Sequence, residues 1–261
     1  MTDRWTFTRC PPDPRLRGYV HDYCAYDERT ESFTRRRELP GDNVVAIINF
    51  GPPIKIDGES VREGFFSGLH DTYVLSESGG EQSGVQINFS PLGAHLLVRV
   101  PMHELAGQLV PLDELFGPRL REHLGNCDDP FAYLDALFLA RLDDALSPVP
   151  SITRALARLR ASEGRVPIGA LAGELGCSPR HLNRHFRDQV GVTPKLFARI
   201  LRFQHAIALI DREPSWAAIA QHAGYYDQAH LVRDFQQFAG ASPTEFTRLR
   251  LPDGGGVRDG L

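Results

Sequence analysis

The chain has 261 residues, of which 42% are hydrophobic and 24% charged, and its formal net charge is −4. This length suggests about two domains, and the hydrophobic content is sufficient for packed cores. No apolar run approaches the ~18 residues of a transmembrane helix, the first residues lack a signal-peptide core, and the four cysteines are scattered without metal-binding spacing. We therefore expect a cytoplasmic protein with reduced thiols, which binds no cofactor.

The charge is divided unevenly along the chain. Residues 151–250 contain 14 Lys and Arg against 8 Asp and Glu, whereas residues 1–150 contain 14 against 23. A basic segment joined to an acidic one is typical of a nucleic-acid-binding domain attached to a second domain. The predicted domains are 1–147 and 151–250, with a stiff Pro-containing linker at 147–150 and a flexible tail at 251–261.

The first half is predicted to be rich in β-strands up to about residue 90. Short apolar runs bounded by turn residues occupy 44–50, 64–69, 72–76 and 84–89. Their close spacing indicates a small barrel or sandwich. Helices are expected at 92–98, 102–109, 112–116 and from Pro130 to about Leu146, and the last of these is of a kind that often pairs across a dimer axis. Arg35, Arg36 and Arg37 are interpreted as a solvated loop, with an anion or partner contact as the alternative.

The second half begins with a pattern typical of a helix-turn-helix. Apolar residues at 168, 171, 172 and 175 recur at helical spacing, and Gly176 stands where a helix must end with a positive φ. Ser178 can then cap a second helix that begins at Pro179 and runs to about Val190. One face of that helix carries Leu182 and Phe186, and another carries basic and amide side chains.

The same pattern returns 48 or 49 residues later. Matched pairs include Ala172 with Ala220, Gly176 with Gly224, and Phe186 with Phe235. A period of this length indicates a repeated supersecondary unit. Asp227 is the predicted cap of the later second helix. An apolar helix of about eighteen residues between the copies is predicted to act as a strut of ~27 Å, so that the two outward faces can enter successive major grooves.

Residues 151–250 resemble the DNA-binding domain of the AraC/XylS family of transcription regulators. The resemblance rests on the paired L/I-A-x-x-x-G cores, the S-P-x-x-L-x-R-x-F helix, the G-x-T-P-x-x-F junction and G-Y-Y-D-Q-A-H-L-x-R-x-F. It implies seven helices and a bipartite site on double-stranded DNA. It also implies that base edges are read by Arg180, Asn183 and Arg184 in the first copy and by Gln228, Ala229, Val232 and Arg233 in the second. Because Ala229 and Val232 offer only apolar contact, we expect sharper sequence readout from the first copy.

Phosphate contacts are predicted from the basic residues around the first copy, namely Arg187, Lys195, Arg199 and Arg202. The resemblance further implies control by a small-molecule effector or by homodimerisation, and a possible contact with RNA polymerase. The sequence is compatible with both activation and repression of transcription. The segment from Gly84 to Gly117 is also similar to the amino-terminal, distantly cupin-like domain of one AraC-family subgroup.

Two alternatives come from other functional classes. The first is a barrel-domain enzyme fused to a DNA-targeting module, which would need a convergent set of catalytic residues that the sequence does not supply. A metal-dependent cupin would need a His-x-His pair, which is absent, and His181 and His185 are assigned to packing or DNA contact rather than to a metal. The second is an interaction protein whose first half serves only to dimerise. The expected protein is a non-enzymatic α+β regulator with a barrel-like first domain and an all-α double helix-turn-helix domain.

Overall fold

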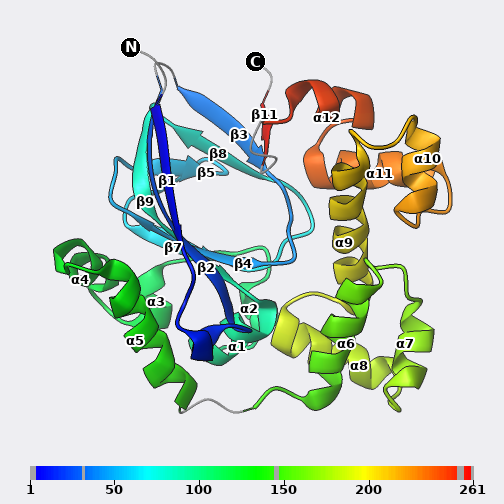
Figure 1. Cartoon of the computed structure of the whole chain (residues 1–261), viewed down its shortest axis with the longest axis horizontal. Helices are drawn as coiled ribbons and strands as arrows, with labels where there is room; N and C mark the ends of the chain where they lie inside the picture. The colour runs from blue at the N-terminus through cyan, green and yellow to red at the C-terminus, as the bar shows by residue number, and fades with distance from the viewer. Residues whose placement is uncertain (1–3, 31–32, 144–146, 252–255, 260–261) are drawn as a thin grey trace.

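The computed structural model describes residues 4–30, 33–143, 147–251 and 256–259. In Figure 1 the β-strands occupy one half of the molecule and the helices that follow Pro150 occupy the other. The predicted α+β class is confirmed, but the amino-terminal domain is not a closed barrel. Its strands form two separate antiparallel sheets.

The larger sheet, sheet A, joins distant parts of the amino-terminal half. Its strands, in spatial order, are β1 (Arg4–Cys10), β2 (Val20–Arg29), β9 (Glu81–Phe89), β4 (Val44–Asn49), β7 (Gly64–Ser67) and β10 (Leu109–Val110). Alternate residues of β4, Val44, Ala46 and Ile48, are buried, so one face of sheet A belongs to the core. The smaller sheet, sheet B, contains β11 (Gly256–Arg258), β3 (Thr34–Glu38), β8 (Val74–Ser78), β5 (Ile54–Ile56) and β6 (Glu59–Val61).

Short helices cover the buried face of sheet A. They are the 3-10 turn Pro14–Leu16, α1 (Pro91–Val98), α2 (Met102–Leu105), α3 (Leu112–Phe116), α4 (Leu120–Asn126) and α5 (Pro130–Asp143). Tyr23 of β2 stacks on Phe131 of α5 and donates a hydrogen bond to Asp135 Oδ1 at 2.7 Å. Burial, together with this carboxylate, raises the pKa of Tyr23. The helix predicted at 102–109 ends early, at Leu105, because Ala106 is extended and Gly107 has a φ of +68°.

The carboxy-terminal half is entirely helical up to residue 249. It contains α6 (Pro150–Ala161), α7 (Ile168–Glu174), α8 (Pro179–Val190), α9 (Pro194–Leu209), α10 (Trp216–His222), α11 (Gln228–Ala239) and α12 (Pro243–Leu249). The predicted caps are confirmed: Ser178 accepts from the His181 amide and Asp227 accepts from the His230 amide. Gly176 and Gly224 have φ values of +66° and +80° at the two turns.

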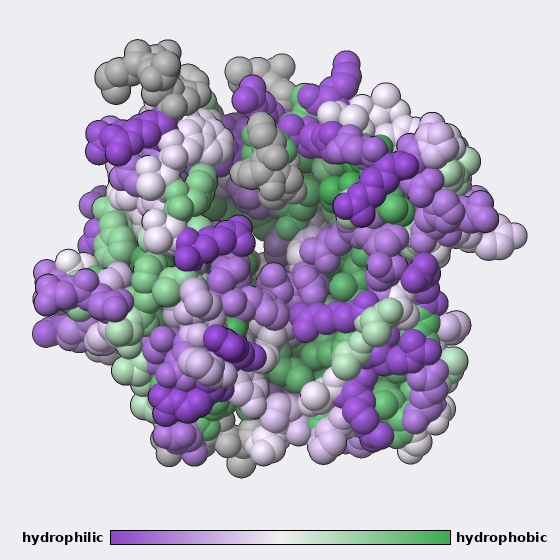
Figure 2. Space-filling model, in the orientation of Figure 1, coloured by the Kyte–Doolittle hydropathy of each residue, from purple (hydrophilic) through white to green (hydrophobic). Residues whose placement is uncertain are grey.

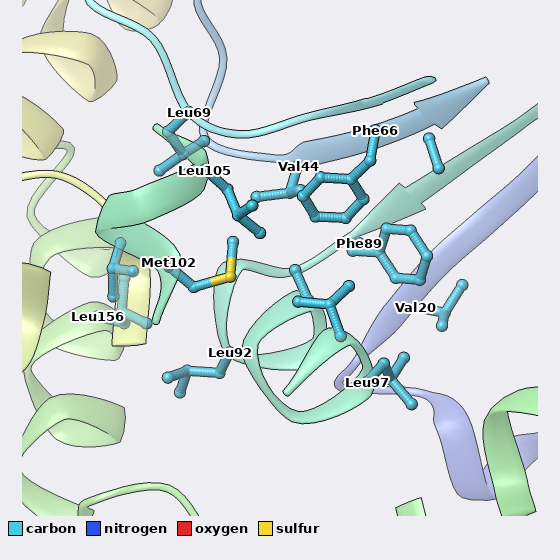
Figure 3. Close-up of a cluster of buried hydrophobic side chains, with 14 of the residues drawn as sticks. Val20, Val44, Phe66, Leu69, Phe89, Leu92, Leu97, Met102, Leu105 and Leu156 are labelled. Atoms are coloured by element: carbon cyan, nitrogen blue, oxygen red, sulfur yellow. The ribbon is translucent and has the colours of Figure 1, made fainter. Parts of the chain in front are cut away.

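The hydrophobic cores do not follow the predicted domain boundary. One continuous core includes Phe66 and Phe89 of sheet A, Met102 of α2, Leu156 of α6, and Phe186 of the first helix-turn-helix. Figure 3 shows Leu156 beside Met102 at the point where the two halves meet. The second helix-turn-helix has a core of its own. The first helix-turn-helix unit is therefore packed onto the amino-terminal domain and shares one hydrophobic core with it.

Three segments differ from the sequence-based expectation. Residues 35–37 lie in β3 rather than in a solvated loop, because each arginine finds a carboxylate partner. Residues 256–258 of the predicted flexible tail form β11, which pairs with β3. The strands β1 to β3 are not among the predicted runs, since β3 is charged at four of its five positions and β1 and β2 interrupt their apolar residues with polar and charged ones. The predicted end of α5 at Leu146 lies outside the described residues.

Candidate nucleic-acid interface

Helix α8 presents a basic and amide face on the molecular surface. Leu182, Phe186 and Val190 are fully buried on the side that packs against the core. Arg180, Asn183, Arg184 and Arg187 are all exposed. They line an open groove of about 780 Å³, together with Ser178, His181, His185, Asp188 and His103 of α2. A groove lined mainly by cationic and amide groups suits the phosphates and base edges of DNA.

The two histidines of α8 lie within this groove. Their ring centroids are 4.3 Å apart, and Arg184 Nη2 lies 3.0 Å from His185 Nε2. Partial burial lowers the pKa of His185, and the neighbouring charges of His181 and Arg184 lower it further. The groove therefore holds more positive charge at acidic pH than at neutral pH.

Helix α11 is the corresponding element of the second unit. Leu231 and Phe235 are fully buried, whereas Gln228, Ala229 and Arg233 are exposed and Val232 is half-buried. Arg233 is the cation among the four predicted base-reading positions of this helix. Tyr226, in the preceding turn, is 94% exposed, while its neighbour Tyr225 is buried. Burial is the main reason that the pKa of Tyr225 is raised.

A buried ion pair fixes α11 against α9. Arg199 Nη2 donates to Asp234 Oδ1 at 2.6 Å and to Gln237 Oε1 at 2.7 Å. The Asp234 side chain is only 2% exposed. The Nε and Nη2 groups of Arg199 are therefore engaged within the domain, and its predicted phosphate contact remains a prediction. Arg202 likewise donates to the Gly164 carbonyl oxygen at 2.8 Å and lies over the Tyr225 ring, whereas Lys195 is exposed.

Helix α9 connects the two units. It contains 16 residues, Pro194–Leu209, slightly fewer than predicted, and spans about 24 Å at a rise of about 1.5 Å per residue. Figure 1 shows it as the vertical link between α8 and α11. The outward faces of both second helices remain on the surface.

The amino-terminal domain holds each unit at a different place. Helices α1 and α2 pack against α8, where Gly191 lies close to the Met102 carbonyl oxygen. At the other end, Arg37 Nη1 donates to the carbonyl oxygens of Ala239 and Gly240 at 3.2 and 3.0 Å, at the end of α11. Helices α8 and α11 are thus both positioned by contacts that come from outside the carboxy-terminal domain.

Further hydrogen bonds surround the Arg37 contact. Thr72 Oγ1 donates to the Gln237 carbonyl oxygen at 3.1 Å, and Gln237 Nε2 donates to the Asp71 carbonyl oxygen at 2.9 Å. Arg37 also lies over the Tyr73 ring and pairs with Asp259. We call this group, formed by Arg37, Asp71, Thr72, Tyr73, Gln237, Gly240 and Asp259, the clasp. The run of three arginines was its only signal in the sequence.

A second candidate site lies on the face of sheet A that is directed toward sheet B. This face carries polar side chains joined in a chain: Gln86 Nε2 donates to Asn88 Oδ1 at 2.9 Å, and Asn88 Nδ2 donates to Asp22 Oδ1. All three are half-buried. Burial raises the pKa of the neighbouring Tyr26. Figure 2 shows that the surface is hollowed near the centre of the molecule.

No cluster of three or more His, Cys, Asp or Glu residues with metal-binding geometry occurs in the part of the chain that the structure describes. Cys10, Cys24, Cys127 and Cys177 are free thiols. Among the described helices, none is both long enough and apolar enough to cross a bilayer.

Comparisons with known proteins cover both halves. Residues 171–249 match the family described as "Helix-turn-helix domain", and residues 8–111 match "Domain of unknown function (DUF6597)". No curated protein sequence matches the chain. ToxT from Vibrio cholerae is similar in structure at 11% identity, over 94% of this chain and 98% of that chain, with a TM-score of 0.48.

Two further solved structures are similar at low identity. A ToxT structure from Vibrio cholerae with bound unsaturated fatty acid is 12% identical over 87% of this chain and 94% of that chain, with a TM-score of 0.47. The carboxy-terminal domain of AraT, a response regulator from Geobacillus stearothermophilus, is 23% identical over 40% of this chain and 88% of that chain, with a TM-score of 0.37.

Two helix-turn-helix units with exposed second helices, joined by one strut helix, define a DNA-binding protein. The family match assigns residues 171–249 to a helix-turn-helix domain. The carboxy-terminal domain is thus a DNA-binding domain of the helix-turn-helix class.

Proposed function

We propose that the protein binds a two-part promoter site through α8 and α11. The observation that carries this proposal is that both helices keep their inner faces buried while their polar faces are exposed. In α8, Arg180, Asn183 and Arg184 read base edges, while Arg187 and Lys195 contact phosphates. In α11, Gln228 and Arg233 supply polar contacts, and Ala229 and Val232 supply apolar ones.

The first unit carries most of the sequence discrimination in this proposal. Arginine can contact guanine with two parallel hydrogen bonds, and asparagine can do the same with adenine. Helix α8 has two such arginines and one asparagine, whereas α11 has one arginine and one glutamine at the matching positions. We therefore expect the half-site bound by α8 to tolerate fewer base changes.

The amino-terminal half controls this binding in our proposal. The support comes from its contacts with both units: α1 and α2 pack on α8, and the clasp holds the end of α11. A small effector between the sheets can change DNA affinity if it binds one arrangement of these contacts better than another. The half-buried Asp22, Asn88 and Gln86 side chains suit a molecule with hydroxyl or amide groups.

Selection of bound duplexes from a random pool tests the DNA proposal. We expect a site with two conserved parts about one helical turn apart, since successive major grooves on one face are about 34 Å apart. A single short motif, or no enrichment, would contradict it. The effector proposal is tested separately by thermal-shift screening of the full chain against metabolites. A ligand that raises the melting temperature of the wild-type protein but not of Asn88→Ala supports the inter-sheet site.

A further inference from the structure

Strand β11 belongs to the carboxy-terminal half of the chain but lies in a sheet of the amino-terminal half. It pairs antiparallel with β3, with Val257 opposite Arg37, and so occupies the outer position of sheet B beside β3. The Asp259 amide extends this ladder by donating to the Arg35 carbonyl oxygen at 3.1 Å. Figure 1 shows β11 between β3 and α12, both of which it contacts. After α12 the chain therefore returns to the domain in which it began.

The apolar side chain of β11 belongs to the second helix-turn-helix. Val257 is fully buried in the core of that unit, together with Phe235 of α11 and Phe246 of α12. Leu251, which follows α12, is also buried, and its amide donates to the Gly256 carbonyl oxygen at 2.9 Å. One short strand thus has its backbone in sheet B and its apolar side chain in the core that α11 covers.

Charged and close contacts hold β11 against β3. The Asp259 carboxylate accepts a hydrogen bond from Arg37 Nε at 2.7 Å and lies 2.9 Å from Arg35 Nε. Because the Asp259 side chain is largely shielded from water, breaking these contacts would leave an unpaired buried charge. A Cβ atom at Gly256 would lie 2.9 Å from the Arg37 carbonyl oxygen, so the two backbones approach as closely as a glycine allows.

The second helix-turn-helix has a core of its own, so its orientation depends on how it is attached to the rest of the molecule. One attachment is α9, which contributes Phe197 to the shared core and Phe203 to the core of the second unit. A second is the contact with sheet B, formed by β11 and the clasp. A body joined through one helix can tilt about the end of that helix, whereas a further attachment on another side removes this freedom.

We propose that β11 sets the separation between the two parts of the DNA site by fixing α11 relative to α8. This inference rests on the proposed function, in which each of these helices reads one part. Successive base pairs differ by about 3.4 Å along the duplex and about 34° around it, since a turn of about 34 Å holds about 10 base pairs. Two rigidly held helices match one separation, and affinity for linked sites is highest when the link matches the span. Val257 and Asp259 are positioning residues that act on DNA through α11.

The experiment is fluorescence anisotropy of the full chain on duplexes that carry the two selected half-sites at separations changed in single-base-pair steps. We expect the wild-type Kd to rise about tenfold for the first step, because direct contacts to bases cannot follow a shift of about 3.4 Å. A chain that ends at Leu251 lacks β11 and should lose less than about threefold, because its second unit can tilt on α9. The ratio of Kd values isolates positioning, since a merely less stable chain loses apparent affinity for every duplex by the same factor.

Two point variants keep the test decisive if the shortened chain fails to fold, and thermal melting establishes which variants are folded. Asp259→Asn keeps the size of the side chain but removes its charge, and it should broaden the tolerated range of separations. Arg258→Ala, whose side chain is exposed on the same strand, is the matched control and should keep the wild-type profile. A wild-type profile in folded Asp259→Asn and shortened chains would overturn this inference alone, as would a wild-type chain that binds two half-sites equally well at every separation. If the second half-site adds no affinity, the proposed function fails and this inference fails with it.

Discussion

Arg37, in the amino-terminal domain, donates a hydrogen bond of 3.0 Å to the carbonyl oxygen of Gly240, the residue that ends α11. The carbonyls at a helix end lack partners within the helix and carry its negative dipole end. The cationic Arg37 therefore acts as a C-terminal cap for α11 that is supplied from a different domain. This relationship ties the orientation of the second helix-turn-helix to sheet B.

Substitution of Arg37 should weaken the attachment of the second helix-turn-helix to the amino-terminal domain. Arg37 and Asp259 are 17% and 13% exposed in their side chains, so breaking the pair leaves a buried charge. We expect Arg37→Ala to lower the free energy of unfolding by about 3 kcal/mol and to change the affinity for the selected DNA site. Urea unfolding and fluorescence anisotropy measure the two effects. Arg29→Ala, whose side chain is 59% exposed, is the control and should cost less than about 1 kcal/mol.

A double-mutant cycle measures the interaction energy between Arg37 and Asp259 apart from the other contacts of each residue. Arg37→Ala, Asp259→Ala and the double variant should give a coupling energy of about 1–3 kcal/mol, because the two side chains are in direct contact at 2.7 Å. Additive losses would show that Arg37 acts through the α11 carbonyls and not through Asp259.

The Arg199–Asp234 pair should be essential to the second unit. Asp234→Ala leaves the Arg199 guanidinium without its carboxylate inside the domain, and we expect a loss of about 3–5 kcal/mol in unfolding free energy. The pair Arg250–Asp211 offers a matched control, because Asp211 is 71% exposed. Asp211→Ala should leave the free energy of unfolding nearly unchanged. Equal losses in the two variants would contradict the assigned role of burial.

Arg184 should distinguish specific from non-specific DNA. Arg184→Ala is expected to cost about 1–3 kcal/mol on the selected site and to relax base preference at one position. Lys195→Ala should weaken binding equally on selected and random duplexes and reduce the salt dependence. Anisotropy titrations on both duplexes at two salt concentrations measure the difference. Equal losses on both duplexes for Arg184→Ala would assign it to phosphate.

Stability should fall on mild acidification. Burial lowers the pKa of His21, His70 and His95 below the ordinary value of 6.5. The unfolded chain therefore binds more protons than the folded chain once the pH drops below about 6.5, and the free energy of unfolding decreases as the pH falls toward the lowered values. Urea unfolding at pH 7.5 and pH 5.5 checks this. A flatter profile in His70→Gln would identify one contributor, and an increase in stability at pH 5.5 would contradict the expectation.

Fragment 151–250 should bind DNA at low salt, but it should melt at a lower temperature than the full chain. Its first unit loses the packing of Met102 and Leu105 and its second unit loses the clasp. Differential scanning calorimetry and anisotropy test this expectation. A fragment as stable as the full chain would show that the shared core is dispensable.

The local elements of the DNA-binding half could be predicted well from the sequence. The Ser178 and Asp227 caps, the positive-φ Gly176 and Gly224, and the buried Phe186 and Phe235 are all decided by residues within a few positions of one another. Each of these features depends on short-range backbone chemistry, which a single sequence displays directly.

The contacts between distant segments could not be predicted in the same way. Nothing near Arg37 indicates that its partners are Gly240 and Asp259, which lie 203 and 222 residues away. Strand β1 offers only Trp5 and Phe7 as alternating apolar residues, and β11 has only three residues, so neither run was long enough to predict a strand. The sequence alone predicts a phosphate contact for Arg199, and only the fold shows that Asp234 lies beside it.

The repeat, the caps and the apolar spacing determined by themselves that this protein carries two helix-turn-helix units, because helix formation and termination are local. Only the tertiary structure decided that the first unit shares a core with the amino-terminal domain and that the second is held by the clasp. The physical reason is that burial and charge pairing depend on which surfaces meet after the chain has folded.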